Sequence, residues 1–154
     1  MLVEFVDKTF PIVMVKLKGT MTDDKDFINF TTTWMGIYKN KRDFIFILDT
    51  DEFEYADPKY AILIADFIKK LKKYPKYLKI SLIYMSNKLL LELLNITFMI
   101  QPPINDVYLI NVNVENKDEL INILETDDIN KNYKIIDNFL KTNNIQYKYI
   151  ESSI

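Results

Sequence analysis

Two carboxylates one residue apart, Asp49 and Asp51, are the residues whose type and spacing come nearest to a reaction centre. They follow the run Phe46-Ile47-Leu48, whose lack of alternation predicts a strand covered on both faces of a sheet. Open α/β sheets bind their ligands at the carboxyl ends of such strands. Carboxylate oxygens suit Mg²⁺, and a carboxylate can attack a phosphoryl group. The pair therefore indicates either metal-assisted phosphoryl chemistry or a solvated strand end.

Residues farther along the chain extend this pattern. Ser86 follows the apolar run 83–85, Lys88 or Lys117 could supply a cation, and Asp127-Asp128 form a second acidic pair. This order resembles that of the haloacid-dehalogenase-like phosphatases. The resemblance implies Asp49 and Asp51 as Mg²⁺ ligands, one of them the nucleophile, with Ser86 and Lys88 completing the catalytic set.

Composition favours a protein without catalytic activity. The 154 residues include no His and no Cys, which excludes Cys nucleophiles, Ser-His-Asp triads, Cys/His zinc sites, haem ligation and disulfides. The only two glycines, Gly19 and Gly36, exclude a Gly-rich phosphate loop. We therefore expect no catalytic residues and no cofactor.

Charge argues against a nucleic-acid partner. The formal net charge is −2, and Arg42 is the only arginine among 20 basic residues, whereas nucleic-acid binders are usually basic and use Arg to read bases. The excess of Lys fits an AT-rich genome, such as that of a large DNA virus, a parasite or a bacterium. The cluster of lysines between Lys69 and Lys79 could bind an anionic membrane surface, but we interpret it as the solvated end of a helix.

Periodicity along the chain predicts alternating strands and helices. Residues 2–6 and 12–18 form a hairpin, and the later strands are expected at 44–48, 78–85 and 107–112. Helices are expected after an N-cap at Thr22, after Asp57-Pro58, and at 88–99 and 117–124. The order indicates an α/β fold in which helices pack on a mostly parallel central sheet.

The pattern weakens after residue 125. Tyr133, Ile136 and Leu140 predict one more helix, and Ile145, Tyr147 and Tyr149 alternate like an edge strand. We therefore divide the chain into an α/β domain, 1–125, and a helix and strand extension, 126–154. The extension could cover a sheet edge or add a strand in a homodimer.

The order of elements resembles the STAS domain of bacterial anti-sigma-factor antagonists and of sulfate-transporter tails. It is also similar to the STAS/SEC14-like proteins related to CRAL-TRIO lipid carriers. Asp49 matches the end of the central STAS strand and Asp57 the Asp before the next helix, but Pro58 replaces the phosphorylated Ser. A family phosphoswitch therefore cannot operate here.

The STAS resemblance implies a noncatalytic, regulatory interaction domain that binds a protein partner or itself. Its binding surface would comprise Asp49, Asp51, Asp57, Pro58 and Tyr60. The alternatives are a carrier of a small molecule or lipid and the phosphatase. The large Ile, Leu and Phe residues of the core leave little room for a carrier's cavity. Since we find neither a signal peptide nor a membrane-spanning segment, we expect a cytoplasmic protein, in the host cytoplasm if it is viral.

Overall fold

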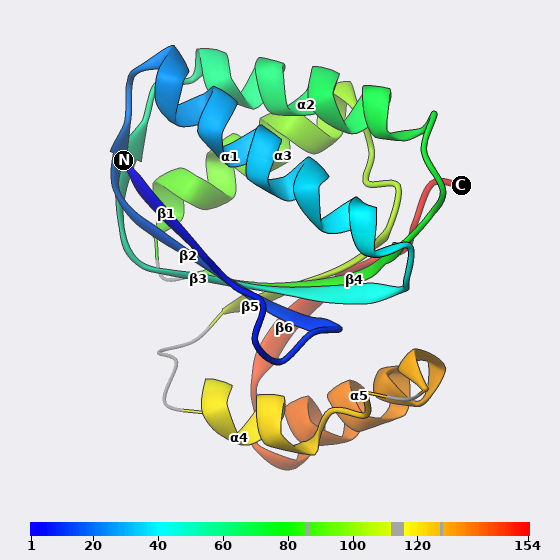
Figure 1. Ribbon diagram of the computed structural model, residues 1–154. Helices are drawn as coiled ribbons and strands as arrows, with labels where there is room; N and C mark the ends of the chain where they lie inside the picture. Colours follow the sequence, from blue (N-terminus) through cyan, green and yellow to red (C-terminus); the bar gives the residue numbers. More distant parts are fainter. Residues whose placement is uncertain (86, 112–115, 127) are drawn as a thin grey trace.

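The sheet holds its strands in sequence order. The computed structural model describes residues 1–85, 87–111, 116–126 and 128–154. Within them, six strands form one sheet (Figure 1): β1 (Leu2–Val6), β2 (Ile12–Met21), β3 (Phe44–Ala56), β4 (Leu78–Tyr84), β5 (Asp106–Asn111) and β6 (Gln146–Ile150). Strands β2 to β5 are parallel, while β1 and β6 pair antiparallel at the two edges. The predicted α/β class, with its N-terminal hairpin, is confirmed.

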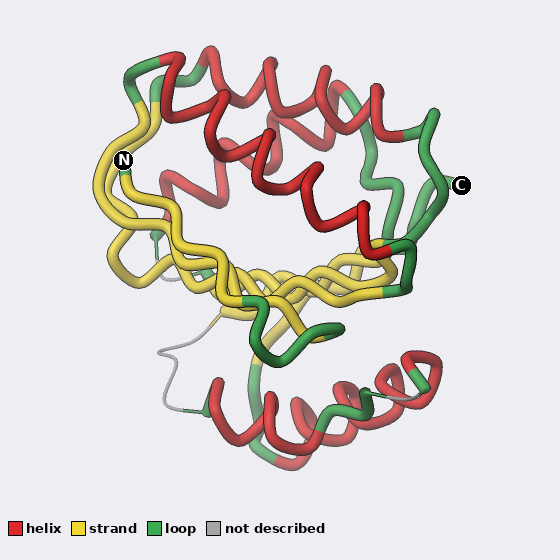
Figure 2. Tube along the Cα trace, in the orientation of Figure 1, coloured by secondary structure: helices red, strands yellow, loops and turns green. Residues whose placement is uncertain are grey.

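Helices cover both faces of the sheet. The connections β2–β3, β3–β4 and β4–β5 place α1 (Asp24–Ile37), α2 (Lys59–Leu71) and α3 (Lys88–Ile100) on one face. The other face carries α4 (Lys117–Ile123) and α5 (Asn132–Thr142), so that three layers result (Figure 2). Two 3₁₀ turns, Tyr38–Asn40 and Ile129–Lys131, follow α1 and precede α5. None of the described helices combines the length and apolar character that a membrane crossing requires.

Alternation along β3 creates two cores. Phe44 and Phe46 point into the core under α1 to α3, whereas Ile45 and Ile47 point into the core above α4 and α5. All four side chains are at most 2 % exposed, as expected for a strand with helices on both faces. Helix α5 packs on the sheet in the second core, and β6 pairs with β5, so both elements of the C-terminal extension are joined to the α/β domain.

Strand β3 is much longer than the apolar run at its start. It continues past Asp49 to Ala56 and stays paired with β2 to the end. Register shifts at Lys16/Lys18 and at Gly19/Thr20, where Gly19 adopts φ +79°, let this ribbon bend. In Figure 1 the β2–β3 ribbon curves up beside the helices and closes one end of the space between them and the sheet.

Several predicted boundaries needed correction. The cap of α1 is Asp23, whose carboxylate accepts a hydrogen bond from the Lys25 amide, and not Thr22. The helix after Asp57-Pro58 begins at Lys59. Apart from β3, which was predicted to end at residue 48, the other predicted elements lie within a few residues of the observed ones. The hairpin strand β2 lies directly beside β3.

Candidate functional site

A lysine side chain lies between the two carboxylates of the acidic pair, Asp49 and Asp51. Asp49 and Asp51 lie within β3, not at its end as predicted, although Asp49 pairs with Tyr84, the last residue of β4. Lys117, the first residue of α4, forms an ion pair with Asp49, and its Nζ lies 3.7 Å from Asp51 Oδ2. The Asp51 amide also donates a hydrogen bond to the Asp49 carboxylate at 3.1 Å. The two acids therefore share one partly buried cation.

This ion pair sets the charge state of Asp49. Burial acts to raise the pKa of the carboxyl group, but the hydrogen bond from Lys117, the Asp51 amide and the charges of Lys117 and Lys16 outweigh it. The pKa of Asp49 is consequently lowered. At neutral pH the carboxylate is ionised and its charge is balanced inside the protein.

The remaining residues of the phosphatase pattern do not gather around the pair. Lys88 is an exposed residue at the start of α3, and Asp128 accepts a hydrogen bond from the Asn130 amide at the start of a 3₁₀ turn. Ser86 and Asp127 lie outside the described residues. Among the residues that are described, no three acidic side chains meet in a group that could hold a metal ion.

The predicted binding surface is only partly at the surface. Pro58 is exposed, and the Asp57 carboxylate accepts a hydrogen bond from the Lys59 amide at 3.0 Å. Tyr60, in contrast, is 2 % exposed. Its hydroxyl donates to Asp24 at 2.9 Å and its ring stacks on Phe27. Tyr60 therefore contributes very little of its side chain to the predicted binding surface.

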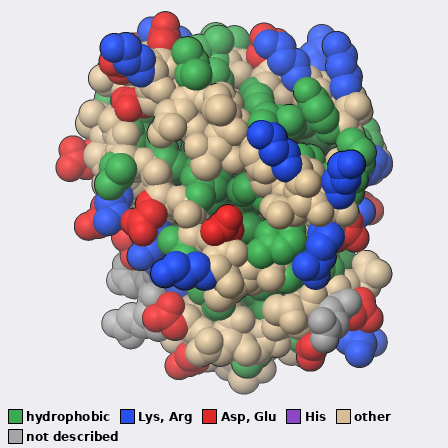
Figure 3. Space-filling view, in the orientation of Figure 1, with side chains coloured by type: hydrophobic (Ala, Val, Ile, Leu, Met, Phe, Trp, Pro, Cys, Tyr) green, Lys and Arg blue, Asp and Glu red, His purple; other side chains and the backbone are tan. Residues whose placement is uncertain are grey.

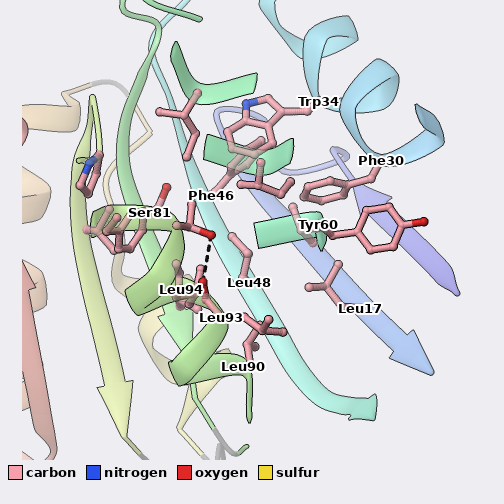
Figure 4. Close-up of a pocket in the computed structure, with 18 of the residues that line it drawn as sticks. Leu17, Phe30, Trp34, Phe46, Leu48, Tyr60, Ser81, Leu90, Leu93 and Leu94 are labelled. Atoms are coloured by element: carbon pink, nitrogen blue, oxygen red, sulfur yellow. Dashed lines mark hydrogen bonds between the residues drawn. The ribbon is translucent and has the colours of Figure 1, made fainter. Parts of the chain in front are cut away.

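Tyr60 instead forms part of the wall of an apolar cavity. The cavity has a volume of about 140 Å³ and lies between the sheet and helices α1 to α3. Figure 4 shows side chains from both layers around it. The sheet contributes Val15, Leu17, Phe46, Leu48, Ile83 and Val107, and the helices contribute Phe30, Trp34, Tyr60, Ile64, Leu90, Leu93 and Leu94.

Aromatic rings pack together on the side of the cavity that faces helix α1. Trp34 of α1 packs edge-on against Phe46 of β3 and Phe67 of α2, each with ring centroids 5.1 Å apart. Phe30, one turn earlier in α1, meets Trp34 edge-on as well. Because these large rings stand between α1 and its neighbours, they hold the helix away from the smaller side chains of the sheet.

Most polar groups in the wall are satisfied by the protein. Asn105 donates to Ser81 Oγ at 2.9 Å, and the Thr97 hydroxyl lies within hydrogen-bond distance of the carbonyls of Leu93 and Ala61. Trp34 Nε1 is buried and makes no hydrogen bond within the described ranges. A cavity lined in this way offers water few partners and suits an apolar occupant.

Comparison with known proteins gave no match: no family model, no curated protein and no solved structure is similar to this chain. Membership of the STAS group thus stays a prediction from the order of the elements. The strongest candidate site, the cavity, is one that the sequence did not predict. The signal was weak because most of the lining residues are apolar residues of the kind found in any core.

Proposed function

We propose that this protein binds a compact apolar ligand, or the apolar part of a larger one, in the cavity between the sheet and α1 to α3. The observation that carries the proposal is the cavity itself. Its volume, about 140 Å³, is close to the roughly 150 Å³ of an apolar cavity that accepts benzene. A single ring or a short branched chain fits this space, and a whole lipid does not.

The energetics of an unfilled core support an occupant. Side chains that line a cavity lack packing partners on one side, which costs folding stability. A ligand that fills the space restores the lost packing contacts. This function needs no catalytic group, in agreement with the absence of His and Cys from the sequence.

The other two functions have weaker support. For the interaction domain, Tyr60 is buried and Asp49 and Asp51 share Lys117. The predicted surface therefore has few side chains that could bind a partner. For the phosphatase, a metal ion at Asp49 would have to displace Lys117. Neither has an observation comparable to the cavity.

Binding of small aromatic probes tests the proposal. We expect toluene and indole to shift the NMR signals of methyl groups that line the cavity and to raise the melting temperature. Saturation at 100 times the dissociation constant corresponds to about 2.7 kcal/mol, or about 5–10 °C for a chain of this size. Absence of any shift with toluene, indole and xenon would contradict the proposal.

A variant that fills the cavity can be compared with a variant that changes the other core. Leu93 lines the cavity from α3, and Leu93→Phe places a ring in the space. Ile47→Val changes the other core, beneath the opposite face of the sheet. We expect the first variant to lose probe binding and the second to keep it despite its lower stability. Equal loss in both variants would indicate a general effect of stability.

A further inference from the structure

Positive charge is concentrated at one end of the molecule. We define the basic pole as residues 39–43 and 69–79, which follow α1 and form the end of α2 with the loop to β4. It holds nine of the 20 basic residues and one of the 22 acidic residues, a net charge of +8 that leaves −10 for the rest of the chain. The overall charge of −2 conceals this separation.

The two segments of the pole are joined by aromatic contacts. The Tyr38 ring lies 6.4 Å from Tyr74 and 6.1 Å from Tyr77, between centroids, and so connects the end of α1 with the loop after α2. Figure 3 shows Lys and Arg side chains gathered at the upper right, over the ends of these helices. The lysines therefore form one surface, although they are separated in the sequence.

Most basic residues of the pole form no ion pair with another described residue. Lys69, Lys70, Lys72, Lys73 and Lys76 are exposed, and none of them forms an ion pair within the described part of the chain. Lys79 pairs with Asp43 at 3.8 Å. Favourable contact with the helix dipole accounts for the lysines in the last turn of α2, but not for those in the loop beyond it.

Aromatic and apolar groups lie among these lysines. Tyr74 is 49 % exposed, and with Met35 and Tyr38 it lines a shallow depression beside Lys39. Lysine and tyrosine together are typical of the polar boundary of a bilayer, where Tyr sits at the headgroup level and Lys reaches the phosphates. The only arginine, Arg42, is exposed and lies over the Phe10 ring at 5.3 Å.

From this combination we propose that the basic pole docks the protein on an anionic lipid surface. Clusters of four to eight basic residues bind acidic headgroups, each contributing about a factor of five to the partition coefficient. The pole has seven exposed lysines, the five named above with Lys39 and Lys41, and this number lies in the range. The inference is independent of the cavity and of the ligand proposed for it.

Vesicle co-sedimentation tests the docking. We expect the protein to sediment with phosphatidylcholine vesicles that contain phosphatidylserine, to stay in solution with pure phosphatidylcholine, and to be released by added salt. The variant Lys70→Gln/Lys72→Gln/Lys73→Gln/Lys76→Gln should lower the partition coefficient by more than about a hundredfold at low salt. Because all four side chains are exposed, its melting temperature should stay close to that of the wild type.

A second variant controls for net charge. Lys25, Lys131, Lys134 and Lys141 are also exposed but lie outside the pole, and their change to Gln alters the net charge equally. This variant should bind as the wild type does. Failure of the wild type to bind the acidic vesicles, or equal loss in both variants, would overturn the proposal.

Two further results would reassign the pole. If it bound poly(U) RNA while acidic vesicles stayed free, its partner would be a nucleic acid. If the pole variant changed the elution volume of the protein while vesicle binding was absent, the pole would contact a second copy of this chain. Either result would also overturn the lipid proposal.

Discussion

Lys117 determines what the acidic pair can do. The Lys117 side chain, which is 12 % exposed, neutralises Asp49 and also approaches Asp51. The charge of Asp49 is therefore balanced where β3 meets the start of α4. Such pairs stabilise chiefly because the loss of one partner leaves the other charge unsatisfied. At this position the lysine therefore has a structural role whether or not a ligand binds.

Removing Lys117 should destabilise the fold. In Lys117→Met the Asp49 carboxylate stays partly buried without its main partner, and we expect a loss of about 1–3 kcal/mol at pH 7 by denaturant unfolding. The double variant Asp49→Asn/Lys117→Met removes both charges and should recover part of this loss. A single variant as stable as the wild type would show that solvent compensates fully.

The same ion pair predicts a dependence on pH. Because the pKa of Asp49 is lower in the folded than in the unfolded protein, its contribution is complete above the unfolded value of about 4. It is lost as the pH falls through the lowered folded value. Comparing unfolding free energies at pH 7 and at pH 3, we expect Asp49→Asn to flatten this loss. An unchanged acid response in that variant would assign it to other carboxylates.

Asn132 has a comparable role in the second core. It is fully buried, accepts a hydrogen bond from the Glu125 amide at 2.7 Å and donates one to the Glu125 carbonyl at 2.9 Å. Asn132→Leu leaves both backbone groups of Glu125 without this partner and should cost about 2–4 kcal/mol. Thermal unfolding checks the value, with the exposed Asn138→Leu as the control.

At the scale of elements, the predicted order was confirmed because hydrophobic periodicity depends on local sequence. The largest deviation was β3, which continues from Asp49 to Ala56 through five acidic and polar positions. Its buried residues there, Thr50, Phe53 and Ala56, recur every third position and not every second. Alternation therefore gave no signal, and pairing with the equally long β2 keeps the segment extended.

The site was harder to predict than the fold. Lys117 was one of two candidate lysines, and only the three-dimensional arrangement distinguishes it from Lys88. Tyr60 follows a proline at a helix start, a context that says nothing about the direction of its ring. The cavity depends on how Trp34 packs against Phe46 of the sheet and Phe67 of α2, which is a property of packing and not of spacing along the chain.

Helix α5 should be essential for stability, although it lies in the C-terminal extension. Ile136 is fully buried in the core beneath the sheet. We expect Ile136→Ala to cost about 2–5 kcal/mol. Ile28→Ala, at a position 59 % exposed on α1, should stay within about 0.5 kcal/mol of the wild type. Equal effects of the two changes in denaturant unfolding would mean that α5 contributes little to the core.

At the scale of the whole molecule, the cavity should make the protein sensitive to pressure. Unfolding eliminates internal voids, so the volume decreases when the chain unfolds. Leu93→Phe occupies part of the void and should reduce this decrease, which pressure-dependent fluorescence of Trp34 can measure. The Ile47→Val variant should show a decrease at least as large as that of the wild type.

The strictly sequential strand order also has a consequence for synthesis on the ribosome. Each strand from β2 to β5 pairs with the strand made just before it, so every new strand finds its template already present. Until β6 arrives, the growing chain presents an unpaired parallel edge, which invites association with other chains. Strand β6, antiparallel and the last of the six strands, then pairs with β5 and replaces the parallel edge with a short antiparallel one.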